Sequence, residues 1–238
     1  MSAAGRLYLL PAPLAQDTPP EAVVPAAVLA RIRALDRFVV ENAKSARAWL
    51  GRCAHPRALR DLTLVELNEH TPAKEVPALL DPVAAGADAG LLSEAGMPAV
   101  ADPGAALVAA AHARGIVVVP CVGPSSILLA LAASGLDGQR FRFVGYLPAD
   151  TAGRREALLD LERRSSRDRE TQLFIETPYR NDAMLAEIVK SCRANTRIAV
   201  AAELTSASES VVMDTVAGWK KRAAKIGKRP AIFLLLAG

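Results

Sequence analysis

Short apolar runs alternate along the chain with longer segments in which apolar residues recur every three or four positions. The short runs predict strands, and the longer segments predict helices. Because helices between consecutive strands allow those strands to lie parallel, the alternation indicates an α/β fold with largely parallel sheets. In the first half of the chain, the predicted strands are residues 6–10, 37–41, 63–67, 88–93 and 116–121.

The second half repeats this alternation, so the whole chain is predicted to be α/β. Its predicted strands are residues 140–146, 172–176, 197–204, 210–215 and 230–236. The predicted helices of the chain are residues 21–34, 73–85, 105–114, 126–134, 151–168, a segment ending at 191, and 216–226.

The residues of three of these segments also predict how far each segment is buried. The β-branched run 116–121 is typical of a fully buried parallel strand. Residues 126–134 are apolar on all sides, which predicts a buried helix. Residues 151–168 interleave arginines with acidic residues, which predicts a solvated helix with ion pairs between positions i and i+4.

The length suits one large domain or two modest domains. A chain of 238 residues with 51% hydrophobic residues can form two modest cores, and 4% aromatics makes those cores aliphatic. We place the boundary so that an N-terminal α/β domain covers residues 1–120 and a C-terminal α/β domain covers residues 121–238.

Two similar loops follow predicted strands in the middle of the chain. LLSEAGMPAVADPGAAL begins at Leu91, and GIVVVPCVGPSSILLAL begins at Gly115. Each apolar run ends in a loop of Gly, Pro and Ser and then re-enters an apolar helix. Such loops expose backbone groups at the carboxyl edge of a sheet, where small ligands bind. The alternative is two ordinary βα loops with no ligand.

The segment SEAGMPAVADPG is similar to the Ser-Asp-Ala-Gly-Thr-Pro…Ser-Asp-Pro-Gly pattern of bacterial 16S ribosomal RNA cytidine 2'-O-ribose methyltransferases. These enzymes belong to the tetrapyrrole-methylase superfamily of S-adenosylmethionine enzymes, and the similarity continues through Pro148. The resemblance implies two consecutive α/β domains with a cofactor cleft between them. It also implies S-adenosylmethionine as cofactor, ribosomal RNA as substrate and a homodimer. The cysteines have no pairable spacing, which indicates reduced thiols in a cytoplasmic protein. No apolar run is long enough to span a membrane, and the three separated histidines indicate no metal site.

The resemblance also implies which residues contact the cofactor. They follow predicted strands or begin the helix after the second loop, and Glu94 stands where the family has Asp. The implied cofactor residues are Pro11, Leu14, Glu94, Met97, Ser126, Ile127, Ile175, Thr177, Ala202 and Ala231.

A ribose hydroxyl is a weak acid, so a carboxylate or histidine could assist its attack on the methyl group. The candidates are Glu41, Glu69, His70 and Glu203, which stand in segments similar to family motifs. Glu41 could instead complement a helix dipole, and His70 could be an ordinary loop residue. The resemblance places Arg47, Tyr179 and Arg180 near the substrate, because they stand in segments similar to family motifs.

The chain departs from the family pattern in several places. Ala15-Gln16 replaces Gly-Asn, Ala202 replaces Arg, and the sequence ends after strand 230–236, where family members continue into a basic helical module. We expect cofactor binding to survive these changes and ribosomal docking to be affected.

Two other hypotheses for the function stay open. One is a methyltransferase of a tetrapyrrole or other small molecule, and the other is a non-catalytic paralogue that binds S-adenosylmethionine or RNA.

The excess of basic over acidic side chains lies in the second half of the chain. Residues 1–110 carry 10 basic and 12 acidic side chains, and residues 111–238 carry 19 and 13. Residues 219–229 hold six basic side chains and no acidic one, which suits either a solubilising helix end or a phosphate-binding patch. The chain has no Gly-x-Gly-x-x-Gly motif and no P-loop lysine, which disfavours a Rossmann dehydrogenase or an NTPase.

Overall fold

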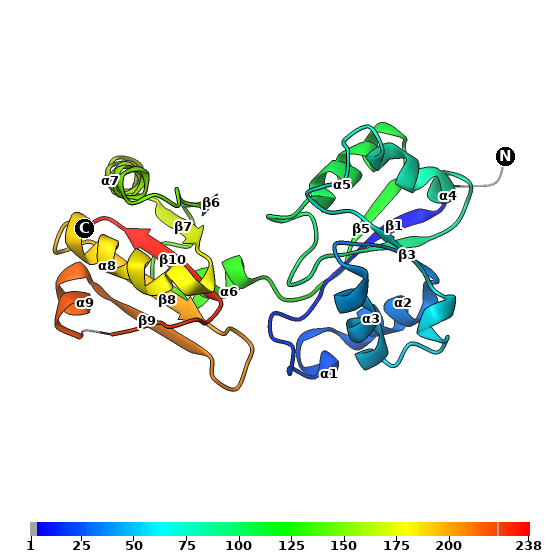
Figure 1. The fold of residues 1–238 in the computed structure, drawn as a ribbon, viewed down its shortest axis with the longest axis horizontal. Helices are drawn as coiled ribbons and strands as arrows, with labels where there is room; N and C mark the ends of the chain where they lie inside the picture. Colours follow the sequence, from blue (N-terminus) through cyan, green and yellow to red (C-terminus); the bar gives the residue numbers. More distant parts are fainter. Residues whose placement is uncertain (1–3, 223) are drawn as a thin grey trace. The chain divides into compact units, whose positions relative to one another are not determined.

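The computed structural model describes residues 4–222 and 224–238. The chain forms two compact units, the first ending at Ser125 and the second beginning at Ser126. Each unit has a five-stranded sheet with helices packed on it (Figure 1). The predicted α/β class is therefore confirmed.

The first sheet is parallel throughout. Its strand order is β3-β2-β4-β1-β5. The strands are β1 (Arg6–Leu10), β2 (Arg37–Val40), β3 (Thr63–Glu66), β4 (Ala89–Leu92) and β5 (Val117–Pro120). The helices are α1 (Pro20–Val23), α2 (Ala26–Ala34), α3 (Ala43–Arg52), α4 (Asp81–Ala84) and α5 (Gly104–Ala113), with 3-10 turns η1 (Leu59–Asp61) and η2 (Val76–Leu80).

Alternating side chains of β1 divide the first core into two layers. Leu10 packs with Phe38 on one face, and Leu7 packs with Leu107 on the other. Gly90 lies in the middle of the sheet, where a Cβ would come within 2.5 Å of Leu10 and 2.9 Å of Phe38. Glycine at this position therefore allows the two large side chains to pack closely over β4.

Two predictions for the first unit are wrong in detail. Strand β5 lies at the edge of the sheet, and Val117 is 56% exposed, so this strand is not fully buried. The predicted helix 21–34 is broken into α1 and α2 at Pro25, which precedes the first residue of α2 because proline cannot continue a helix from its interior.

The second sheet has the order β6-β7-β10-β8-β9 and is mixed. Only β6 and β7 are parallel, and the other three neighbouring pairs are antiparallel. The expectation of a largely parallel sheet is therefore wrong for this unit. A short connection joins β8 to the antiparallel strand β9, and β10 lies between β7 and β8 and runs antiparallel to both. The strands are β6 (Phe141–Tyr146), β7 (Thr171–Ile175), β8 (Arg197–Ala202), β9 (Ser210–Thr215) and β10 (Ala231–Leu236).

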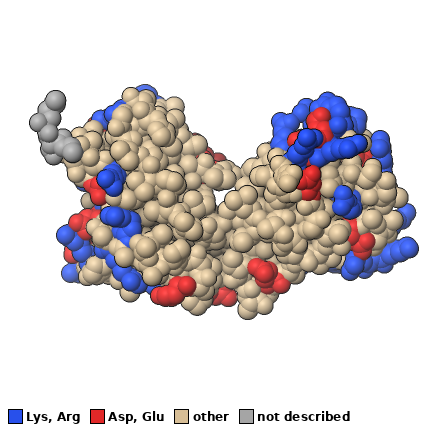
Figure 2. Space-filling model, turned by 180° about the vertical axis from the view of Figure 1, so that it is seen from behind, with Lys and Arg blue, Asp and Glu red and all other residues tan. Residues whose placement is uncertain are grey.

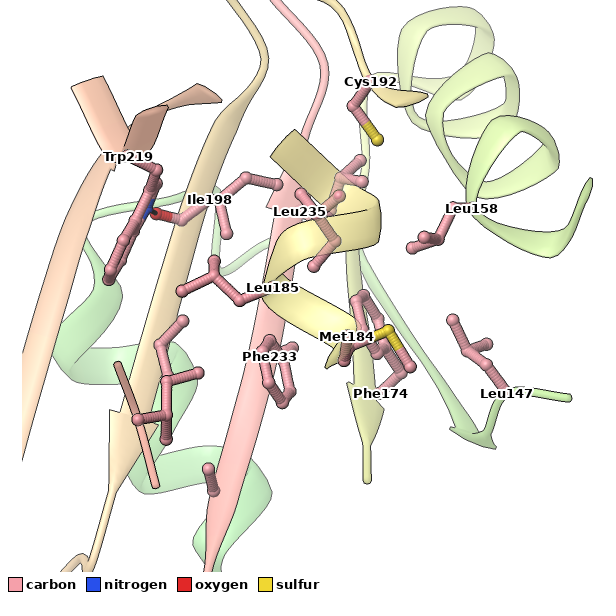
Figure 3. Close-up of a cluster of buried hydrophobic side chains, with 14 of the residues drawn as sticks. Leu147, Leu158, Phe174, Met184, Leu185, Cys192, Ile198, Trp219, Phe233 and Leu235 are labelled. Atoms are coloured by element: carbon pink, nitrogen blue, oxygen red, sulfur yellow. Dashed lines mark hydrogen bonds between the residues drawn. The ribbon is translucent and has the colours of Figure 1, made fainter. Parts of the chain in front are cut away.

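Helices cover both faces of the second sheet. Figure 3 shows the core on one face, where Phe174 and Phe233 stack with ring centroids 5.5 Å apart beneath Met184. Trp219 closes this core, and its indole N–H donates to the Ile198 carbonyl at 2.9 Å. The helices are α6 (Ser126–Ser134), α7 (Thr151–Asp168), α8 (Asn181–Ser191) and α9 (Val216–Arg222), with the 3-10 turn η3 (Pro178–Arg180).

The helix predictions for the second unit have mixed outcomes. Helix α7 has the predicted bounds and carries the expected pair Arg164–Asp160 at 2.6 Å. Helix α6 is buried on one side only, and Leu128 is 56% exposed, so the fully buried helix is wrong. Helix α9 ends at Arg222, before the predicted end at 226, and position 223 lies outside the described residues.

In the described part of the chain, no helix has the length and apolar character needed to cross a membrane.

Candidate functional site

The loops after β1 and β4 are joined at the carboxyl edge of the first sheet. Ala12 and Gly96 exchange backbone hydrogen bonds of 2.9 and 3.1 Å. Gly96 has φ +73°, and a Cβ there would lie 3.2 Å from the Leu14 side chain. The bridge thus brings four of the predicted cofactor residues to one edge, namely Pro11, Leu14, Glu94 and Met97.

The loop after β5 lies against the same edge. The Cys121 amide donates to the Leu9 carbonyl at 3.0 Å, which extends the pairing of β5 with β1. A Cβ on Gly123 would lie 2.2 Å from the ring of Pro11, so only glycine fits. Ser126 and Ile127, the predicted cofactor residues that follow, form the first turn of α6 in the second unit.

A chain of hydrogen bonds fixes the two glutamates of this edge. The Glu94 amide donates to Glu41 Oε2 at 3.0 Å, and Ser45 Oγ donates to Glu94 Oε1 at 3.1 Å. Asn42 caps α3 by accepting from the amides of Lys44 and Ser45. Ser45 and Asn42 were not predicted as site residues, because their role depends on the contact with Glu94, distant in sequence.

The side chain of Glu41 is partly buried among other carboxylates. Burial raises the pKa of its carboxyl, and the nearby carboxylates of Asp102, Glu94 and Glu69 raise it further, against the lowering effect of the Glu94 amide. Glu41 and Asp102 line a narrow pocket with room for about one water molecule. A carboxyl with a raised pKa in such a position can exchange a proton closer to neutral pH than an ordinary glutamate.

The loop before α5 is held in a strained conformation. Ala99 and Ala101 have φ of +66° and +61°, a region that side chains with a Cβ rarely adopt. Asp102 stabilises this loop by accepting from the Ala99 amide at 2.9 Å and the Gly104 amide at 2.7 Å. Backbone strain is often found at functional sites, and Asp102, which was not predicted as a site residue, holds this strained loop in place.

The other predicted residues of the first unit lie at the surface. Glu69 and His70 follow β3, are 86% and 85% exposed in their side chains, and approach each other to 3.7 Å. Arg47 is exposed on α3. The structure therefore places Glu41 in contact with Glu94. Glu69 affects Glu41 only by raising the pKa of its carboxyl further.

The predicted residues of the second unit gather at one edge of its sheet. Ala202 at the end of β8 pairs with Ala231 at the start of β10. Ile232 pairs in turn with Ile175 at the end of β7, two residues before Thr177. These segments are distant in the sequence, and the sheet brings them side by side.

A buried carboxylate organises the turn after β7. Glu176 Oε1 accepts from the Thr177 amide at 2.6 Å and from Arg180 Nε and Nη2 at 2.9 and 2.6 Å. This hydrogen bonding raises the pKa of Arg180. The other oxygen, Oε2, is buried and has no hydrogen-bond partner among the described residues. Glu176 lies between the predicted cofactor residues Ile175 and Thr177, and its spacing of four from Arg180 was visible in the sequence.

A pocket of about 300 Å³ opens beside Ala202 in the second unit. Its apolar lining comes from Val200, Val212 and Trp219, and Arg222 and Arg229 contribute basic side chains. Among the described residues, no group of three or more His, Cys, Asp or Glu side chains is arranged to hold a metal ion.

Comparison with protein families and curated proteins gives consistent matches. The family model described as Tetrapyrrole (Corrin/Porphyrin) Methylases matches residues 24–218. Ribosomal RNA small subunit methyltransferase I of Xylella fastidiosa is 35% identical over 187 residues, which cover 78% of this chain and 65% of the relative. The enzyme of the same name from Vibrio cholerae is 33% identical over 145 residues, covering 61% of this chain and 49% of the relative. The chain thus spans about half to two thirds of the length of these relatives.

Solved structures match over nearly the whole chain. The methyltransferase CobJ has a TM-score of 0.64 at 20% identity and covers 99% of this chain and 95% of its own. Diphthine synthase has a TM-score of 0.66 at 16% identity, with coverage of 97% and 89%. Likeness at this level of identity shows a shared fold. Together with the family model, which spans most of both units, it shows that the chain belongs to the tetrapyrrole (corrin/porphyrin) methylase family.

Proposed function

We propose that the protein is an S-adenosylmethionine-dependent methyltransferase that acts on a ribose 2'-hydroxyl of ribosomal RNA. The observation that carries the proposal is the carboxyl edge of the first sheet, where the Ala12–Gly96 bridge and Gly123 bring three loops together. The names of the similar curated relatives support ribosomal RNA as the substrate. From the resemblance we also propose a homodimer, and from the scattered cysteines a cytoplasmic location.

The residues at these edges suit S-adenosylmethionine. Gly96 and Gly123 leave no side chain where the loops meet, so backbone groups line the edge. The buried Glu176 Oε2 has unused hydrogen-bonding capacity. When bound, S-adenosylmethionine supplies a methyl group on a sulfonium. The residues proposed to hold it are Pro11, Leu14, Glu94 and Met97 in the first unit, and Ser126, Ile127, Ile175, Thr177, Ala202 and Ala231 in the second.

Glu41 is the proposed general base. Its raised pKa makes the carboxylate a better proton acceptor than an exposed glutamate, and the Glu94 amide at 3.0 Å holds Oε2 in place. Glu69 and His70 are weaker candidates, because their side chains are exposed and held only by each other. Arg47, Tyr179 and Arg180 are proposed to contact the RNA.

Calorimetric titration of S-adenosylmethionine tests the cofactor site. We expect micromolar binding by the natural chain and its loss in Ser126→Trp, which places a large ring at the start of α6. Ser166→Trp, an equal change on the exposed side of α7, is the control and keeps the affinity. A folded natural chain that does not bind S-adenosylmethionine would overturn the proposal.

A further inference from the structure

Two tyrosines are exposed at the edge of the second sheet that carries Ile175 and Thr177. Tyr146 is 61% exposed and Tyr179 is 69% exposed. Tyr146 ends β6 and pairs with Ile175, while Tyr179 lies in η3, directly after β7. Large exposed rings need an explanation in a chain with only 4% aromatic residues.

The backbone of β6 is shaped to present Tyr146. Phe143 pairs with Leu173 and Tyr146 pairs with Ile175, so β6 has one residue more than β7 at this bulge. Gly145 lies in the bulge with φ +73°. An extra residue reverses the alternation of side chains, and bulges of this kind re-aim a side chain next to a functional site. Tyr146 therefore points to the same face of the sheet as Phe143 and Ile175.

An immobilised arginine accompanies the two rings. The Arg180 guanidinium lies 5.5 Å from the centre of the Tyr179 ring and is held by two hydrogen bonds to the buried Glu176. Tyr146 is close enough that its phenol also contributes to the raised pKa of Arg180. A cation that is already fixed in place loses little conformational freedom when it binds a phosphate or stacks on a base.

The surroundings carry further positive charge. Arg140, just before the edge strand β6, and Arg142 within it are exposed toward the end of β6 opposite Tyr146. Figure 2 shows many Lys and Arg side chains over α7, with acidic residues interleaved. Such charge attracts a polyanion, and exposed aromatic rings stack with its bases.

We propose that Tyr146, Tyr179 and Arg180 form a stacking platform for the unpaired bases of single-stranded RNA. The inference deepens the proposed function, because it names the residues that hold the RNA and the single-stranded state that they recognise. Stacking on a ring requires a base face that is free, which a double helix does not offer. Tyr146 is new to the site, and its role follows from the bulge and its place beside Arg180.

Fluorescence anisotropy with a labelled ten-nucleotide RNA tests the platform. Tyr146→Ala and Tyr179→Ala should each raise the dissociation constant for this RNA roughly 5- to 150-fold. This range corresponds to the loss of about 1–3 kcal/mol of binding free energy per stacked base. Phe141→Ala is the matched control, because Phe141 is an exposed aromatic at the opposite end of β6. Its affinity should equal that of the natural chain, and a duplex of the same length should bind equally to all variants.

The platform is wrong if the natural chain does not bind the RNA, if both tyrosine variants keep its affinity, or if Phe141→Ala loses as much. Thermal unfolding of each variant confirms that it is folded. S-adenosylmethionine titration on the same samples separates the two proposals. Tyrosine-dependent RNA binding without cofactor binding supports the platform and overturns the methyltransferase. Cofactor binding with tyrosine-independent RNA affinity overturns the platform alone.

Discussion

At the scale of single residues, Glu41 shows how a contact distant in sequence alters chemistry. Its carboxyl is half-buried beside Glu94 and Asp102, and burial is the main cause of its raised pKa. Similarity to a family motif placed Glu41 near the ligand. The carboxylate of Asp102, which raises this pKa further, could not be predicted as a partner of Glu41, because only the sheet edge brings the two residues together.

The raised pKa of Glu41 predicts a specific dependence of stability on pH. The folded state binds this proton more tightly than the unfolded state, so the stabilising contribution is full below the ordinary pKa of 4.5 and is lost as the pH rises through the raised value. In urea unfolding, Glu41→Gln should therefore gain stability relative to the natural chain as the pH increases above 4.5. A difference between the two proteins that is constant with pH would contradict this account.

At the scale of elements, the strands were predictable and their neighbours were not. Each apolar run in the sequence forms a strand within a few residues of its predicted bounds. Local patterns contain neither the order of the strands nor their register. They therefore could not predict the edge position of β5, the antiparallel pairs of β10 or the bulge in β6. The break at Pro25 was visible in the sequence, and the helix prediction gave it too little weight.

The bulge in β6 gives a prediction at this scale. A Cβ on Gly145 would meet no heavy atom within 4 Å, so the cost of Gly145→Ala comes from φ +73° alone. We expect a loss of about 1 kcal/mol in the free energy of unfolding, measured with urea. Gly138→Ala is the control, because it has the same open space without a positive φ. Equal stability of the two variants would show that the bulge does not depend on glycine.

At the scale of the whole molecule, the two units differ in how the strands of their sheets are paired. The first is parallel and gathers its βα loops at one edge, and the second is mixed and brings the ends of β7 and β8 beside the start of β10. The sequence predicted two α/β domains from length, composition and resemblance. The antiparallel pairing of the second sheet was missed, because its strands read as the same apolar runs as those of the first.

The proposed methyl transfer to ribose is tested by following a labelled methyl group from S-adenosylmethionine to 16S ribosomal RNA in small ribosomal subunits. We expect label on a ribose 2'-oxygen. Because Glu41 is the proposed base, the rate should fall roughly 10²- to 10⁴-fold in Glu41→Gln. Glu21→Gln, an exposed change on α1, should keep the natural rate. A natural chain that binds S-adenosylmethionine and leaves the RNA unlabelled would contradict the claim.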